Sequence, residues 1–276
     1  MAARPYPRKY VKKVRVEDGT LGGVSVVKFV PPEKKSDGAV LFFHGGSYVY
    51  GSAKNSHADL VARLALVSGA SVVAVEYRLA PEHRYPAQLE DALTAFDALV
   101  ASGTAANEIV LAGDSAGGNL AIATQLALRD RGGPQAKALA LLSPWVDLTM
   151  PGASFTENER YDFGTRAVLA NQAKQFAGDV ALHDPRVSPT YATLAGLSPA
   201  IVLVGEAEIL RDDIRVFAKR LRDEGVDVTL HEAADMPHNA AFFADYHASA
   251  KAAFDALVAF VGAQLYRSRD PPLRAR

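Results

Sequence analysis

The sequence predicts an α/β fold, with a mostly parallel sheet of about eight strands, helices on both faces and a short cap. Two observations lead to this prediction. Short apolar, β-branched runs bounded by glycine, proline or charged residues recur along the chain, and longer segments with helical spacing separate them. Because open-sheet α/β proteins often reach this length as one unit, we expect a single domain over residues 1–276.

The expected strands are Val11–Glu17, Val24–Val30, Ala39–Phe43, Ser71–Val75, Ile109–Ala112, Ala138–Leu142 and Ala200–Val204, followed by a strand pattern that contains His231. A glycine-rich turn joins the first two, which predicts a leading antiparallel pair. The later strands alternate with helical segments, which predicts parallel pairing. Helical faces are marked by Leu60, Leu64 and Val67, and by Leu120, Thr124, Ala127 and Leu128.

The segment Thr149–Leu197 interrupts this alternation, because it contains one helical run, Arg166–Phe176, and no convincing strand. In open α/β sheets the ligand site lies beyond the carboxyl ends of the strands. An insertion after a strand is therefore well placed to cover that site, and we expect a cap insertion at about 149–197. Residues 1–12 form only a short amino-terminal cap segment, and the domain is expected to end near Leu265.

Composition excludes several classes of function. Lys and Arg number 30 against 31 Asp and Glu, so charge gives no reason to expect nucleic acid or stable association with a membrane. The absence of cysteine excludes disulfides, thiolate zinc sites and a cysteine nucleophile. No apolar run near the amino terminus resembles a signal peptide, which predicts a cytoplasmic protein that binds small, neutral molecules.

A nucleophile motif follows the strand Ile109–Ala112. Gly113 and Gly117 flank Ser115 in the pattern G-x-S-x-G, and a helical segment comes next. The two glycines allow a sharp strand-to-helix turn that exposes the serine at the edge of the sheet. A serine that merely caps a helix would not need glycine at both positions. We therefore predict that Ser115 is the nucleophile.

A nucleophilic serine requires hydrogen-bond donors for the oxyanion of its tetrahedral intermediate. The strand Ala39–Phe43 runs into a glycine-rich loop that begins with His44, and the backbone amides of such a loop can point inward. We expect His44 to be structural. The candidate oxyanion donors are the amides of Gly45, Gly46, Ser47 and Ala116.

The general base must lie close to the nucleophile turn. His238 can do so, because it follows the last strand pattern and precedes a long terminal helix. His231 lies within a strand pattern and His247 begins a helix, so we expect both to be structural. His57, His83 and His183 are expected to be solvated or locally hydrogen-bonded.

A carboxylate should orient this histidine, and four candidates follow Ala200–Val204, namely Glu206, Glu208, Asp212 and Asp213. The two aspartates lie near the start of a helix, where acidic residues need no catalytic role. Glu208 is preferred over Glu206 because it lies in the loop just past the strand end.

The chain resembles the hormone-sensitive-lipase-like esterases, a branch of the α/β hydrolases, from about Gly23 to Phe260. The matching motifs are His44–Gly46, Glu76–Ala87, Gly113–Gly118, Ser143–Asp147 and Met236–His238. The family's acid motif, Asp-x-Leu-x-Asp, is matched in register by Glu208–Asp212, which favours Glu208 independently. Ser47 and Asn239 stand where the family usually has glycine, and only a short segment precedes the first strand.

This resemblance implies a carboxylesterase that acts through an acyl-enzyme on small or medium uncharged esters, with no cofactor or metal, often as a homodimer. The short amino terminus predicts an open pocket, which favours short acyl groups. Two alternatives remain at this point. The same residues could serve a lactone hydrolase or an arylformamidase or other amide hydrolase, and a hydrolase-like scaffold could be a non-catalytic binding protein.

Overall fold

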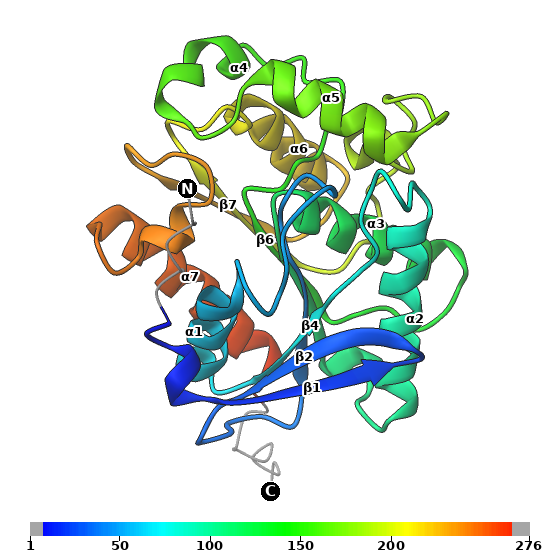
Figure 1. Ribbon diagram of the computed structural model, residues 1–276, viewed down its shortest axis with the longest axis vertical. Coiled ribbons are helices and arrows are strands. Elements are labelled where there is room, and N and C mark those ends of the chain that lie inside the picture. The colour runs from blue at the N-terminus through cyan, green and yellow to red at the C-terminus, as the bar shows by residue number, and fades with distance from the viewer. Residues whose placement is uncertain (1–7, 267–276) are drawn as a thin grey trace, which may run out of the picture.

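The computed structural model describes residues 8–266, which form one eight-stranded sheet in the order β1-β2-β4-β3-β5-β6-β7-β8 (Figure 1). The strands are β1 (Arg15–Leu21), β2 (Val24–Val30), β3 (Ala39–Phe43), β4 (Ser71–Val75), β5 (Ile109–Asp114), β6 (Ala138–Leu142), β7 (Ala200–Gly205) and β8 (Val228–Ala233). β2 pairs antiparallel with β1 and β4, and the remaining pairs are parallel. The predicted α/β fold is confirmed.

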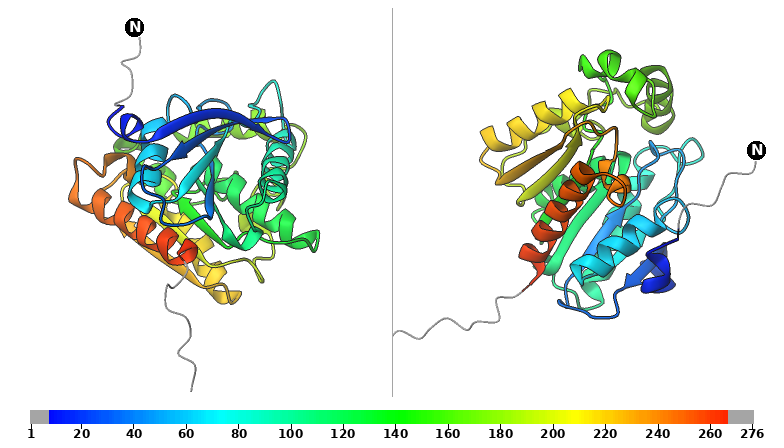
Figure 2. Two further views of the ribbon diagram at one scale, coloured as in Figure 1. Left: turned by 90° about the horizontal axis from the view of Figure 1, so that it is seen from below. Right: turned by 90° about the vertical axis from the view of Figure 1, so that its left-hand side faces the viewer.

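Helices cover both faces of the sheet, and Figure 2 shows α1 and α7 together on one of them. The α-helices are α1 (Ala58–Ser68), α2 (Ala87–Ala101), α3 (Ala116–Asp130), α4 (Ser154–Glu157), α5 (Arg166–Ala177), α6 (Arg211–Asp223) and α7 (Ala248–Leu265). Successive side chains point to opposite faces: Leu41 and Phe43 belong to the apolar cluster that includes residues of α2, α3 and α6, whereas Val40 and Phe42 belong to the cluster with α1 and α7. Because both faces are covered, every residue of β3 to β7 is buried.

The first strand begins four residues later than the sequence predicted. Gly22 and Gly23 both have positive φ, 58° and 90°, and form the two-residue hairpin loop that fixes the pairing from Arg15↔Val30 to Leu21↔Val24. Residues Val11–Lys13 instead form a 3-10 helix, η1, and the Asp59 carboxylate of α1 accepts hydrogen bonds from the amides of Tyr10 and Val11 at its start.

The prediction of the buried helical faces is wrong for one residue, Val67. Leu60 and Leu64 of α1 are buried, but Val67 is 42% exposed. The helix ends one turn after Leu64, where Gly69 takes the left-handed conformation, and its last residues lie at the edge of the layer. Three short 3-10 helices connect other elements, namely η2 (Ala106–Glu108), η4 (Pro189–Tyr191) and η5 (Ala240–Phe243).

The segment between β6 and β7 carries α4, the 3-10 helix η3 (Glu159–Tyr161) and α5, and it lies above the sheet in Figure 1. It contains no strand, as predicted, and its helix at 166–176 is α5. The expected amino-terminal cap segment, 1–12, falls partly outside the described residues. Its described part is held against the body, since Tyr10 donates a hydrogen bond to Asp245.

Within residues 8–266 one helix, α7, is long and apolar enough to cross a membrane by length and composition alone. The core helix of a folded domain passes the same test. In this structure Phe254, Leu257 and Val261 of α7 are buried against the sheet, in the layer shared with α1.

Candidate active site

Ser115 occupies the sharp turn between β5 and α3, as predicted. Its backbone has φ 54° and ψ −120°, a strained conformation for a residue with a side chain, and the residue is buried. The two flanking positions have no room for a side chain, so both must be glycine. A Cβ atom at Gly113 would lie 2.3 Å from the carbonyl oxygen of Gly117, and one at Gly117 would lie 2.0 Å from that of Phe43. The sequence G-x-S-x-G therefore folds here because no other residue fits the two outer positions.

His238 and Glu208 come together across the ends of β7 and β8. Nδ1 of His238 lies 3.8 Å from Oε2 of Glu208, which is fully buried. The same oxygen accepts hydrogen bonds from the Ser143 hydroxyl at 2.6 Å and from the Gly205 amide at 3.0 Å. The rival carboxylate, Glu206, is exposed. Among the residues described, Glu208 is the only carboxylate within ion-pair distance of this imidazole.

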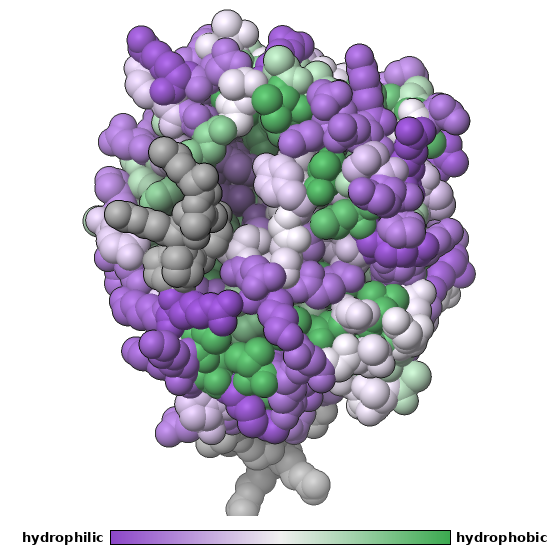
Figure 3. Space-filling model, viewed as in Figure 1, coloured by the Kyte–Doolittle hydropathy of each residue, from purple (hydrophilic) through white to green (hydrophobic). Residues whose placement is uncertain are grey.

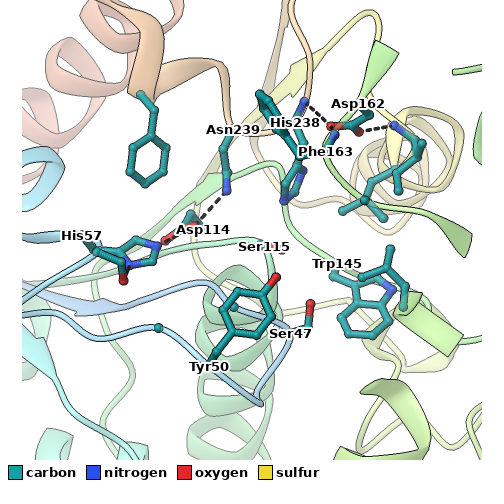
Figure 4. Close-up of a pocket in the computed structure, with 18 of the residues that line it drawn as sticks. Ser47, Tyr50, His57, Asp114, Ser115, Trp145, Asp162, Phe163, His238 and Asn239 are labelled. Atoms are coloured by element: carbon teal, nitrogen blue, oxygen red, sulfur yellow. Dashed lines mark hydrogen bonds and ion pairs between the residues drawn. The ribbon is translucent and has the colours of Figure 1, made fainter. Parts of the chain in front are cut away.

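The local charges favour a protonated imidazole. Burial by itself would lower the pKa of His238, but Glu208, Asp162 and Asp114 supply negative charge that outweighs burial and raises this pKa above its ordinary value. Figure 4 shows His238 and Ser115 on the same cavity, with Asp162 beside the loop that carries the histidine. This electrostatic arrangement suits a group that must become positively charged during a reaction.

The loop after β3 brings backbone amides to the same cavity, although one of the expected donors is already used. The Gly45 amide donates to Oδ1 of Asp114 at 2.9 Å, so it is not free to face an oxyanion. Gly46 has φ 120°, and a Cβ atom there would meet the Tyr50 carbonyl oxygen at 2.0 Å. Ser47 adopts φ 51°, which explains why glycine is usual at this position in the resembling family. The amides of Gly46, Ser47 and Ala116 remain as candidate donors.

A buried ion pair that the sequence did not suggest lies behind this loop. Nε2 of His57 is 3.2 Å from Oδ2 of Asp114, and the Asn239 side chain donates to the same oxygen at 2.9 Å. Burial alone would lower the pKa of His57 and raise that of Asp114, but their mutual attraction reverses both directions. Asn239 has φ 59°, a left-handed conformation that asparagine tolerates, next to the expected base.

His57 was expected to be solvated or locally hydrogen-bonded. Its Nδ1 does lie 2.8 Å from the hydroxyl of the neighbouring Ser56, but the residue is buried, and its Nε2 also reaches Asp114, 57 residues away, a contact that no local pattern marks. His44 is structural, as expected, since its ring stacks on Tyr77 and its Nδ1 lies 2.8 Å from the Gly45 carbonyl oxygen. His231 lies in β8 and His247 is the N-cap of α7, both as predicted.

The cavity has a volume of about 600 Å³. Figure 3 shows a recess beneath the cap that is bordered by residues of mixed hydropathy. Aromatic side chains supply much of its wall, namely Tyr50, Trp145, Phe163, Phe242, Phe243 and Tyr246. Asp162 also lines it, and nothing in the sequence singled that residue out. In the described part of the chain no group of three or more His, Cys, Asp or Glu side chains is placed to hold a metal ion.

Comparisons with known proteins agree with this geometry. Residues 40–242 match the family described as alpha/beta hydrolase fold. An acetyl-hydrolase of Streptomyces hygroscopicus is 37% identical over 217 residues, which cover 78% of this chain and 72% of that protein. The carboxylesterase NlhH of Mycobacterium tuberculosis strain H37Rv is 34% identical over 86% of this chain and 79% of its own.

Among solved structures, an esterase from the bacterial hormone-sensitive lipase family has a TM-score of 0.88 and 35% identity, covering 95% of this chain and 94% of that one. The chain therefore belongs to the hormone-sensitive-lipase family of α/β hydrolases. It is a carboxylic ester hydrolase.

Proposed function

We propose that this protein hydrolyses short-chain, uncharged carboxylic esters through an acyl-enzyme, with Ser115 as nucleophile, His238 as general base and Glu208 as the acid that orients it. The observation that carries this proposal is the meeting of strained Ser115 and His238 on one cavity, with buried Glu208 behind the imidazole. No lactone or amide chemistry is needed to account for these groups.

The steps follow from the positions of the groups. Ser115 Oγ attacks the ester carbonyl carbon while His238 takes its proton, and the amides of Gly46, Ser47 and Ala116 stabilise the oxyanion. The imidazolium then gives the proton to the departing alkoxide, which leaves the acyl group on the serine. Water, deprotonated by His238, attacks this acyl-enzyme, and the carboxylic acid and free serine are released.

Two observations support a preference for short acyl groups. Tyr50, Phe163 and Tyr246 line the cavity yet remain 58%, 72% and 77% exposed, so this side of the cavity is open to solvent. A long acyl chain lying there would keep part of its length in water. The similarity to an acetyl-hydrolase agrees with a small acyl group.

Replacement of the two principal residues tests the assignment. Ser115→Ala and His238→Ala should each lower kcat on p-nitrophenyl butyrate by on the order of 10⁴-fold, because residues that act as a unit lose most of their joint effect when one is removed. A fluorophosphonate probe should label the wild-type chain and not Ser115→Ala. Near-wild-type turnover in either variant, with the circular dichroism spectrum unchanged, would refute the assignment.

We further propose a homodimer, as the family resemblance implies, with a small-molecule ester as the ligand and no role for nucleic acid. Light scattering should then give a mass near twice 29.4 kDa. A strictly monomeric species would exclude the dimer without affecting the ester hydrolysis.

A further inference from the structure

The Asp162 side chain joins three separate parts of the molecule. It lies in the cap, just after η3, and its Oδ1 accepts hydrogen bonds from the amide of Phe163 at 2.7 Å and from that of His238 at 3.1 Å. Its Oδ2 accepts the amide of Ile209 at 2.7 Å. Figure 4 shows the contacts of Asp162 to the loop that carries His238 and to the neighbouring loop, which carries Glu208. One carboxylate therefore links the cap to both loops.

These contacts act on the proposed catalytic pair through the backbone. One of the amides bound by Asp162 belongs to Ile209, which directly follows Glu208 in the chain, and another belongs to His238 itself. The distance between the Glu208 carboxylate and the His238 imidazole depends on how these two loops are held relative to one another. A displacement of about 1 Å in such a pair can cost roughly 10²-fold in rate.

Other cap residues strengthen the same connection. The Asn158 side chain donates to the carbonyl oxygen of Glu208 at 2.9 Å, and the Ser154 hydroxyl donates to that of Ile209 at 2.7 Å. On the opposite loop, the ring of Phe163 stacks on Phe243 with centroids 5.9 Å apart. Several contacts thus join the cap to the loops that carry Glu208 and His238. Among these contacts, those of Asp162 reach both loops.

We propose that Asp162 is a positioning residue, which holds the Glu208 and His238 loops in register and places negative charge beside the imidazole. This inference rests on the proposed function of that pair. Asp162 need not touch the substrate, since it acts through the backbone of one residue and the charge state of the other. Its role makes the cap a part of the catalytic geometry rather than a cover alone.

Three carboxylates act on the imidazole from three elements: Glu208 from the loop after β7, Asp114 from the end of β5, and Asp162 from the cap. His57, at the start of α1, pairs with Asp114 and offsets part of its charge. Loss of the Asp162 charge removes one of these three anions and leaves only Glu208 and Asp114 near the imidazole. The imidazolium is then less stabilised, so it should give up its proton at lower pH.

The experiment uses the full chain with four single substitutions and measures kcat and KM on p-nitrophenyl butyrate across pH. Asp162→Asn and Asp162→Ala should lower kcat by about 10- to 100-fold, with a smaller change in KM. The acid limb of kcat/KM should move to lower pH by roughly half a unit. Asp162→Glu retains the charge, so its acid limb should stay at the wild-type position whatever its kcat.

Glu159→Gln is the matched control, because it removes one carboxylate from an exposed position three residues away. It should leave kcat and the acid limb unchanged. If Asp162→Ala does not fold, Asp162→Asn carries the test, with folding checked by circular dichroism. The proposal is overturned if Asp162→Asn keeps kcat within about twofold of wild type, or if its acid limb stays in place while kcat falls. A wild-type chain that hydrolyses no ester would overturn the proposed function itself.

Discussion

Nδ1 of His238 lies 3.8 Å from Oε2 of Glu208, close enough for an ion pair but too far for a hydrogen bond. The carboxylate oxygen is fixed by the Ser143 hydroxyl and the Gly205 amide, whereas Nδ1 has no hydrogen-bond partner among the described residues. The Glu208 carboxylate is therefore held in place, and the imidazole must approach it for a hydrogen bond to form. Catalytic hydrogen bonds often tighten only when substrate is bound.

Replacement of Glu208 by glutamine removes the charge and keeps the shape. The imidazolium would lose its main stabilising anion, so Glu208→Gln should lower kcat by about 10³- to 10⁴-fold. Glu206→Gln is the control, since Glu206 is exposed and lies two residues away. Steady-state kinetics on p-nitrophenyl butyrate decide the ranking. The reverse order would move the acid to Glu206, and equal activity in both variants would point to Asp212 or Asp213.

The pH dependence of the reaction should report the charge around His238. Only the neutral imidazole can accept the serine proton, so activity is lost as pH falls through the pKa of this residue. Because nearby carboxylates raise that pKa, the acid limb of kcat/KM should have its midpoint above 6.5, the ordinary value for histidine. In Glu208→Gln the residual activity should show a lower midpoint. A wild-type midpoint clearly below 6.5 would contradict the role given to these charges.

Much of the candidate site could be predicted from sequence because its signals are local. The turn at Ser115 depends on Gly113 and Gly117, each two residues away, and His238 is marked by its place after the last strand. Asp162 and His57 could not be found in this way, since their partners lie 76 and 57 residues away. A solvated carboxylate and a half-buried bridging one look identical in a sequence, and only the packing of the cap distinguishes them.

Long-range contacts also decide which backbone amides are free to act as oxyanion donors. The glycine-rich loop predicted the region of the oxyanion donors, but the Gly45 amide is engaged by Asp114, 69 residues later in the chain. The displacement of β1 has a different cause. The Gly22-Gly23 turn fixes the register from Leu21↔Val24 to Arg15↔Val30, so the pairing of β1 ends where β2 ends.

A buried carboxylate at the base of the cap should affect stability. Asp213, in the first turn of α6, is buried, and its Oδ2 has no partner among the described residues. Burial raises its pKa to about 7, the negative charge of Asp147 acts in the same direction, and the Gly152 amide opposes them. The folded state therefore prefers the protonated acid, and stability falls as pH rises from the unfolded value near 3.8 through 7.

Asp213→Asn mimics the protonated acid at every pH. It should raise the free energy of unfolding at about pH 8 by on the order of a few kcal/mol, with a difference that shrinks as pH falls toward 4. Asp212→Asn is the matched control, because the pKa of Asp212 is lowered and its carboxylate pairs with Arg211 and accepts the Ser154 amide. That variant should be destabilised at about pH 8. Chemical denaturation at several pH values measures both, and a destabilised Asp213→Asn at about pH 8 would contradict the expectation.

The solvent-exposed side of the cavity predicts how activity depends on acyl length. Each methylene that remains in water forfeits roughly 0.8 kcal/mol of binding, so extension beyond the enclosed part of the pocket gains little affinity and costs chain entropy. Exposed Tyr50, Phe163 and Tyr246 leave room for a bulky alcohol part at the same time. We therefore expect kcat/KM on p-nitrophenyl esters to be highest between acetate and hexanoate and to fall toward dodecanoate. Ser115→Ala gives the background hydrolysis for each ester, and an optimum at dodecanoate or longer would show that the acyl site is deep and closed.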